Sequence, residues 1–91
     1  MPYIDQEIRD YYDPGIEEIL SKIDRLTTPG DVSYIISRIL LHYISINDKN
    51  YQFLEGIIGK LDLISYELKR RMIAPYEDQK IEENGDLEGF E

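Results

Sequence analysis

Residues 28–46 read TPGDVSYIISRILLHYISI, and this stretch decides the fold. It opens on Thr28-Pro29-Gly30-Asp31, in which threonine is the cap, proline takes the first helical position and an acid stands three residues after the cap. The apolar residues that follow project onto one broad face, namely Val32, Ile35, Ile36, Ile39, Leu40, Tyr43 and Ile46. The stretch therefore predicts a helix over about 29–46 whose broad face belongs to the core.

The rest of this helix is not an ordinary solvated surface. Small and apolar side chains form a second strip that consists of Ser33, Ser37, Leu41 and Ile44. Monomeric proteins rarely leave such a contiguous patch exposed. We therefore expect a second contact surface, covered by self-association, most simply in a two-fold dimer.

Helices are also predicted on both sides of this stretch. Upstream, Asp13-Pro14 offers a cap and a proline at the first helical position, which predicts a helix over about 14–26. Downstream, a polar turn precedes a helix over about 51–74, which Pro75 ends. Three main helices of this kind predict an all-α fold, a small bundle.

The end of the chain is acidic. Residues 75–91 hold 7 acidic side chains against Lys80 alone, whereas residues 1–74 hold 12 acidic and 9 basic side chains. No apolar period is sustained in the last segment. We expect a helical domain over 1–74 and an irregular acidic tail over 75–91, which docks partly through Tyr76 and Ile81.

The helix over 51–74 has two distinct sides. Its core stripe consists of Phe53, Leu54, Ile57, Ile58, Leu61, Ile64, Leu68 and Met72. The opposite side carries Gly56, Gly59 and Leu63, and each mid-helix glycine costs about 1 kcal/mol relative to alanine. Such glycines indicate close approach by another helix or a ligand, with mere tolerance as the alternative. We assign these three residues to the oligomer interface.

Composition excludes several classes of protein. The absence of cysteine excludes a disulfide scaffold and thiolate chemistry, and it fits a reducing, cytoplasmic compartment. No signal peptide opens the chain, and no apolar stretch approaches the roughly 20 residues of a membrane span. The net charge of −9 makes duplex DNA or RNA a poor partner, because backbone affinity comes from basic residues.

Catalytic and metal-binding motifs are also missing. The single histidine, His42, has Arg38 and Ile46 one turn away, so nothing prepares it as a general base. In the acidic segment, Gly85 falls before the third oxygen ligand that a calcium loop requires. No phosphate loop or nucleophile elbow occurs. The sequence therefore predicts a protein that is not an enzyme and holds neither metal nor cofactor.

One motif, Tyr-x-x-x-Arg, occurs twice, as Tyr34 with Arg38 and as Tyr66 with Arg70. Residues four apart share a helix face, so each pair offers an aromatic platform beside a planar cation. Rings of this kind stack on bases, and the guanidinium fork takes phosphate. The predicted ligand-binding residues are Tyr34, Arg38, Tyr66, Arg70, Arg71 and Tyr76. The alternative is an intrahelical cation–π contact, with the arginines paired to the acidic tail.

Several segments carry a resemblance to a known family. They are Thr28-Pro29-Gly30-Asp31 with Tyr34 and Arg38, Tyr51-Gln52 with Ile58-Gly59, Arg70-Arg71, and Ala74 to Asp78 leading into Lys80 to Asp86. Together they resemble an uncharacterised family of small proteins from tailed bacteriophages and prophages, a domain of unknown function. The resemblance implies a viral source and a location in the host cytoplasm. Small phage proteins often antagonise host defence, and some trap signalling nucleotides between subunits.

The leading interpretation is a homo-oligomer that binds an anionic, nucleotide-like small molecule, as a sponge for a host defence signal. The alternative is a protein-interaction module or inhibitor of a host protein, without a small-molecule ligand. A nucleic-acid mimic built on the acidic tail is third, and an enzyme is fourth.

Overall fold

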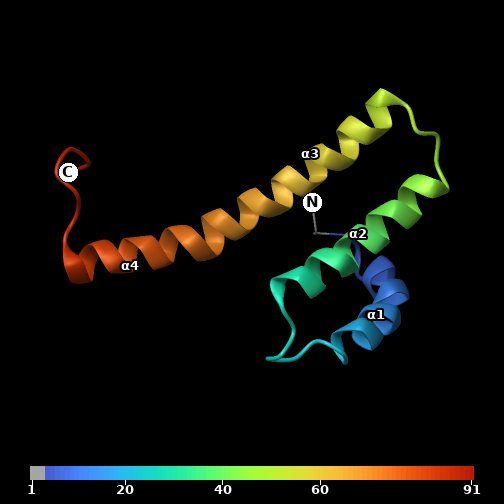
Figure 1. The fold of residues 1–91 in the computed structure, drawn as a ribbon, viewed down its shortest axis with the longest axis horizontal. Helices are drawn as coiled ribbons and strands as arrows, with labels where there is room; N and C mark the ends of the chain where they lie inside the picture. The colour runs from blue at the N-terminus through green and yellow to red at the C-terminus, as the bar shows by residue number, and fades with distance from the viewer. Residues whose placement is uncertain (1–3) are drawn as a thin grey trace. The chain divides into compact units, whose positions relative to one another are not determined.

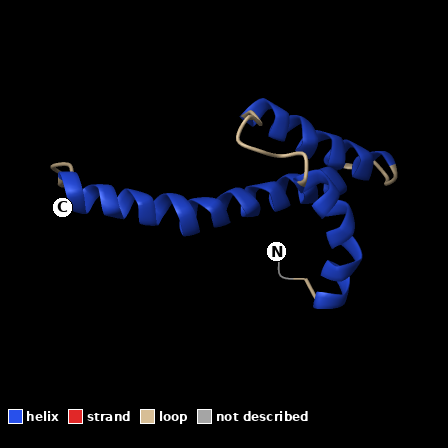
Figure 2. Cartoon of the chain, turned by 90° about the horizontal axis from the view of Figure 1, so that it is seen from below, coloured by secondary structure: helices blue, strands red, loops and turns tan. Residues whose placement is uncertain are grey.

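The computed structural model describes residues 4–91. Its elements follow in the order α1 (Gln6–Leu20), α2 (Pro29–Ser45), α3 (Tyr51–Leu68), the π-helix η1 (Lys69–Ile73) and α4 (Ala74–Asn84) (Figure 1). Figure 2 draws helices and loops only, and no strand occurs among residues 4–91. The predicted all-α class is confirmed. None of the helices described is long and apolar enough to cross a membrane.

Two compact units divide the chain, one of Pro2–Leu54 and the other of Glu55–Glu91. The first unit holds α1, α2 and the first turn of α3. The second holds the rest of α3, η1 and α4, which follow one another without a connecting loop. The first unit therefore has two facing helices, whereas the second is a single helical run with its C-terminal residues.

Helix α2 is the element that the sequence predicts best, since Pro29–Ser45 differs from the predicted 29–46 by one residue. Its start is a reciprocal capping box. The Thr28 Oγ1 accepts a hydrogen bond from the Asp31 N–H at 3.1 Å, and the Asp31 carboxylate accepts one from the Thr28 N–H at 3.0 Å. Two backbone donors that the helix cannot satisfy are thereby paired.

Helix α1 begins at Gln6 and runs through Pro14, so the prediction that Asp13-Pro14 starts a helix at 14 is wrong. Asp5 caps the observed start, where its carbonyl accepts from the Arg9 N–H at 3.0 Å. Proline inside a helix removes one backbone hydrogen bond. Helix α1 nevertheless continues through Pro14 to Leu20.

The predicted end of this helix at 26 is also wrong, because α1 ends at Leu20. Asp24 gives the physical reason. Its carboxylate accepts from the Leu26 N–H at 2.8 Å, and its own N–H donates to the Thr27 hydroxyl at 3.0 Å. Local side-chain bonds of this kind offer the backbone an alternative to the helix.

The predicted irregular tail is wrong for most of its length. The helix does not stop at Pro75, since α4 continues from Ala74 to Asn84 and ends at Gly85, which has a φ of 87°. The π-helix η1 explains the continuation. Its backbone hydrogen bonds join residues five apart, one more than in an α-helix, and the Ala74 N–H donates to the Lys69 carbonyl in this way. Pro75 then stands in the first turn of α4, where its missing N–H is tolerated.

No residue among 4–91 is buried, which corrects the predicted core faces. On α2, Ile35 and Leu40 are half-buried, while Ile39 and Tyr43 are exposed. A helix buries its apolar stripe only against other packed elements. One pair of helices in the first unit and one helical run in the second are too few to enclose a core.

Candidate functional site

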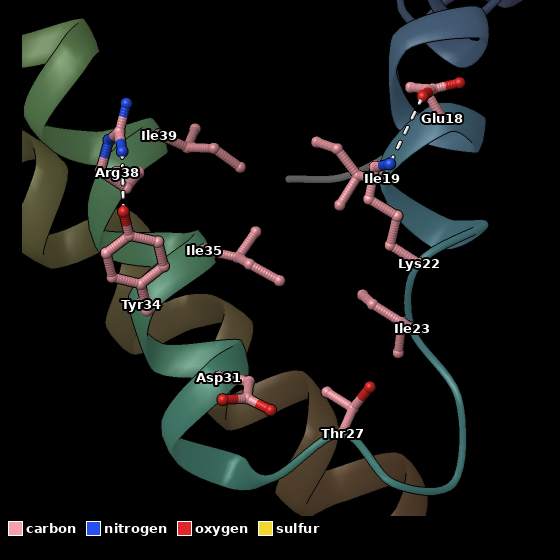
Figure 3. Close-up of a pocket in the computed structure, with 10 residues that line it drawn as sticks. All are labelled: Glu18, Ile19, Lys22, Ile23, Thr27, Asp31, Tyr34, Ile35, Arg38 and Ile39. Carbon is pink, nitrogen blue, oxygen red and sulfur yellow. Dashed lines mark hydrogen bonds and ion pairs between the residues drawn. The ribbon is translucent and has the colours of Figure 1, made fainter.

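A groove of about 550 Å³ lies in the first unit, between the end of α1 and the first half of α2 (Figure 3). Its size is within the usual range for small-molecule sites. The residues that line it are Glu18, Ile19, Lys22, Ile23, Thr27, Asp31, Tyr34, Ile35, Arg38 and Ile39. Two predicted ligand-binding residues, Tyr34 and Arg38, thus share this groove with Ile35 and Ile39, which the sequence placed in the core.

The walls of this groove are apolar. Ile19 and Ile23 stand four residues apart on one side, and Ile35 and Ile39 have the same spacing on α2. Figure 3 shows the two isoleucine pairs pointing toward one another across the groove. Ile35 and Ile39, which were predicted as core, therefore form one wall of an open, apolar groove, with Ile19 and Ile23 opposite them.

Tyr34 and Arg38 stand at the rim, joined to each other. The Arg38 Nη1 donates to the Tyr34 hydroxyl at 2.8 Å, and the guanidinium carbon lies 5.7 Å from the ring centroid. An intrahelical cation–π contact thus forms, as the alternative interpretation of this motif expects. These two contacts hold the guanidinium in place, and the hydrogen bond to Tyr34 uses one of its five N–H groups.

The charges on the rim are not equally available. Lys22 pairs with Glu18 at 3.9 Å, and the Asp31 carboxylate is held by the capping box. Arg38 has no carboxylate partner in the part of the chain that the structure describes. It is therefore the cation at this groove that remains available to an anion.

The second Tyr-x-x-x-Arg pair, in the other unit, is arranged differently. Arg70 Nη2 contacts both carboxylate oxygens of Glu67, at 3.1 and 3.2 Å, and Arg71 lies 3.7 Å from the same carboxylate. The sequence analysis missed Glu67, although its place three and four residues before the two arginines is the usual spacing of helical ion pairs. These arginines are thus partly neutralised, and Tyr66 is left exposed.

Tyr76 also has a partner that the sequence analysis did not assign. The Lys80 ammonium lies 5.6 Å from the centroid of its ring, one turn along α4. Lys80 pairs in turn with Glu83 at 3.3 Å. Tyr76 is therefore an exposed ring beside a cation, like Tyr34.

The predicted oligomer-interface residues lie on α2 and α3. On α2, Ser33, Ser37 and Leu41 are exposed, with 62% of Leu41 accessible, and Ile44 is half-buried. On α3, a Cβ added at Gly56 or Gly59 would meet nothing within 4 Å. Close approach to these two glycines, and to the neighbouring Leu63, is not made within the described chain, so the interface stays a prediction.

Metal ligands and the single histidine are the remaining groups to place. No group of three or more His, Asp or Glu side chains among residues 4–91 is placed to hold a metal ion. His42 is exposed and lines only a shallow hollow with Arg38, Ile39 and Leu41. The groove therefore offers an apolar lining, a ring and one available cation, which are binding elements.

Comparison with known proteins adds the family. The model of a family described as a domain of unknown function (DUF6899) matches residues 1–87. The chain belongs to this family. No curated protein and no solved structure matches it.

The match covers both units of this DUF6899 chain almost completely, including α4. The groove residues Ile19, Lys22 and Ile23, which the sequence analysis did not assign to a site, also lie within it. Their helical spacing was visible in the sequence, but that spacing is the same for a core stripe and for the wall of a groove. Only the position of the facing helix, α2, shows whether such a stripe is buried in a core or forms the wall of a groove.

Proposed function

We propose that this protein is a non-enzymatic phage or prophage protein that binds an anionic, nucleotide-like small molecule in the groove between α1 and α2. In the host cytoplasm it would act, as a homo-oligomer, to sequester a host defence signal. One observation carries the proposal: Arg38, which has no carboxylate partner among residues 4–91, stands beside an exposed tyrosine at the rim of an apolar groove.

The groove matches the two parts of a nucleotide. Ile35 and Ile39, with the isoleucines opposite them, supply apolar walls for a base, and the Tyr34 ring supplies a stacking surface. Arg38 keeps most of its donors after bonding Tyr34, so its fork can take a phosphate. Lys22 across the groove adds positive charge if a ligand phosphate displaces Glu18.

The proposal includes a second, weaker binding region, which consists of Tyr66, Arg70, Arg71 and Tyr76. A ligand there must compete with Glu67 for the two arginines. Charge-assisted hydrogen bonds are strong, so this competition lowers the affinity. We therefore place the principal site at Tyr34 and Arg38.

Isothermal titration calorimetry tests the proposal against a panel of mono- and dinucleotides, linear and cyclic, with inorganic phosphate as the minimal anion. For a nucleotide that binds, Arg38→Ala should weaken affinity about tenfold to a hundredfold, since a hydrogen bond to a charged group contributes about 1.5–3 kcal/mol. Arg38→Lys should recover little if the contact is bidentate. Arg25→Ala, which changes net charge equally in the turn after α1, is the matched control. Equal affinity in the Arg38 and Arg25 variants, or no binding across the panel, would refute the proposed site.

A second candidate function is a protein-interaction module or inhibitor of a host protein. The exposed Leu41 beside the small Ser33 and Ser37 favours it, because this strip can meet a partner helix closely. Two variants separate the two functions. Leu41→Asn, which adds no charge one turn from Arg38, should remove activity in the host while leaving nucleotide titrations unchanged if the strip is the functional surface. Loss of activity only with Arg38→Ala favours the groove.

A further inference from the structure

The groove between α1 and α2 has opposite charges at two points along one rim. Asp31 stands at the end where α2 begins, and Arg38 stands further along the same helix (Figure 3). A step of seven residues is nearly two helical turns, so these side chains share one side of α2 and lie about 10.5 Å apart along its axis. Tyr34 stands between them, three residues after Asp31 and four before Arg38. The rim therefore presents an acceptor, a ring and a cation in that order.

The Asp31 carboxylate is held in place, yet half of it is unused. Its Oδ2 accepts the hydrogen bond from the Thr28 N–H at 3.0 Å in the capping box. Its Oδ1 has no hydrogen-bond partner among residues 4–91. An ionised carboxylate only accepts hydrogen bonds, and it has about four lone-pair sites. This end of the groove is therefore a fixed acceptor that can take two donors from a ligand.

A nucleotide has the same order of groups as this rim. Its base has a hydrogen-bonding edge and a flat ring, and its phosphate follows at a comparable distance from that edge. With the phosphate at Arg38 and the base stacked on Tyr34, the edge of the base faces Asp31. The reverse orientation would set the phosphate beside a carboxylate, and like charges repel. The charges of the rim therefore fix the direction in which a nucleotide lies.

The chemistry of the acceptor selects among the bases. Guanine presents two adjacent donors, N1–H and N2–H₂, on its Watson–Crick edge. Adenine and cytosine each present one donor beside a ring nitrogen that accepts, and uracil presents one N–H between two carbonyl oxygens. An acceptor that faces a carboxylate stays unpaired, which costs binding free energy. Guanine is therefore the base whose edge complements Asp31.

We propose that the groove selects guanine nucleotides, with the Asp31 carboxylate accepting hydrogen bonds from the N1–H and N2–H₂ groups of the base. Tyr34 stacks on the ring, and Arg38 binds the phosphate. This inference deepens the proposed function and rests on it, since it names the class of nucleotide that the same groove takes. It gives Asp31 a role in specificity in addition to its role in the helix cap.

Calorimetry with matched nucleotides tests the selection of the base. The probes are GMP, IMP, AMP and 2′-deoxy-GMP, together with the cyclic dinucleotides of guanine, hypoxanthine and adenine. Hypoxanthine differs from guanine only by lacking the 2-amino group, so GMP should bind about tenfold more tightly than IMP, the loss expected for one hydrogen bond to a charged group. AMP should bind more weakly still. The deoxynucleotide should match GMP, because Asp31 contacts the base and not the ribose.

Substitution of Asp31 tests the residue. In Asp31→Asn the side-chain carbonyl can still accept from the Thr28 N–H, while an NH₂ donor replaces the free oxygen. The preference for GMP over AMP should fall about tenfold, with helicity unchanged in circular dichroism. Asp13→Asn removes the same charge from an exposed position of α1 outside the groove, so this matched control should keep the preference. Arg38→Ala should weaken GMP and AMP equally, because it removes the contact with the phosphate that they share.

The outcomes separate this inference from the proposed function. A guanine preference that is lost in Asp31→Asn and kept in Asp13→Asn supports the inference. Binding of the three bases with equal affinity overturns it while the proposed function stands, and so does a preference for ribose over deoxyribose without one for guanine. A guanine preference that survives in Asp31→Asn also overturns it, because another group then reads the base. Absence of binding by every probe refutes the proposed function and the inference together.

Discussion

Replacing Thr28 by alanine removes half of the capping box that starts α2. The structure shows what is lost: the Asp31 N–H loses its 3.1 Å acceptor, and the Asp31 carboxylate keeps its 3.0 Å bond to the backbone N–H of residue 28. Loss of an N-cap threonine costs about 0.5–2 kcal/mol. Both residues are exposed, so water replaces part of the lost bond and we expect about 1 kcal/mol.

This loss should lower the midpoint of thermal unfolding by about 4–8 °C, the usual scaling for a chain of this size. Circular dichroism at 222 nm measures it, at one fixed protein concentration, because self-association would otherwise add to the apparent stability. Thr28→Ser is the matched control, since it keeps the hydroxyl. The double change of Thr28 and Asp31 to alanine should cost less than the sum of the single changes, because the two bonds are reciprocal.

Equal stability of the alanine and serine variants would refute the argument. It would mean that the Thr28 hydroxyl contributes nothing to the start of α2, and that the groove wall does not depend on the capping box. A fall in stability with full additivity would instead show that the two hydrogen bonds form independently.

Three further predictions address assembly and the C-terminal helix. Pro75→Ala should raise helicity in circular dichroism at 222 nm, because alanine restores a backbone donor within the helical run of η1 and α4; unchanged or lower helicity would contradict this. Leu41→Glu should change helicity little, since 62% of the side chain is accessible, and unfolding in circular dichroism would show that Leu41 belongs to a core. Glu67→Gln should free Arg70 and tighten any nucleotide bound in the second unit, and unchanged calorimetric affinity would place that ligand elsewhere.

The sequence alone predicts the parts of this protein that depend on residues close along the chain. Helix α2 follows from Thr28 and Asp31, three residues apart, and the contact of Tyr34 with Arg38 follows from a spacing of four. The helical class follows from the 3.6-residue apolar period. Two of the three wrong boundaries arise where local bonding competes with simple rules: Asp24 draws the backbone out of α1, and η1 accommodates Pro75 inside a helix that the rule would end.

The tertiary structure alone decides what the apolar faces do. Ile35 and Ile39 have the spacing of a buried core, and the sequence placed them there, but together with Ile19 and Ile23 they line an open groove. Periodicity specifies which side of a helix is apolar, and it does not specify what packs against that side. The availability of Arg38 is set in the same way, because among the described residues no carboxylate reaches it in space.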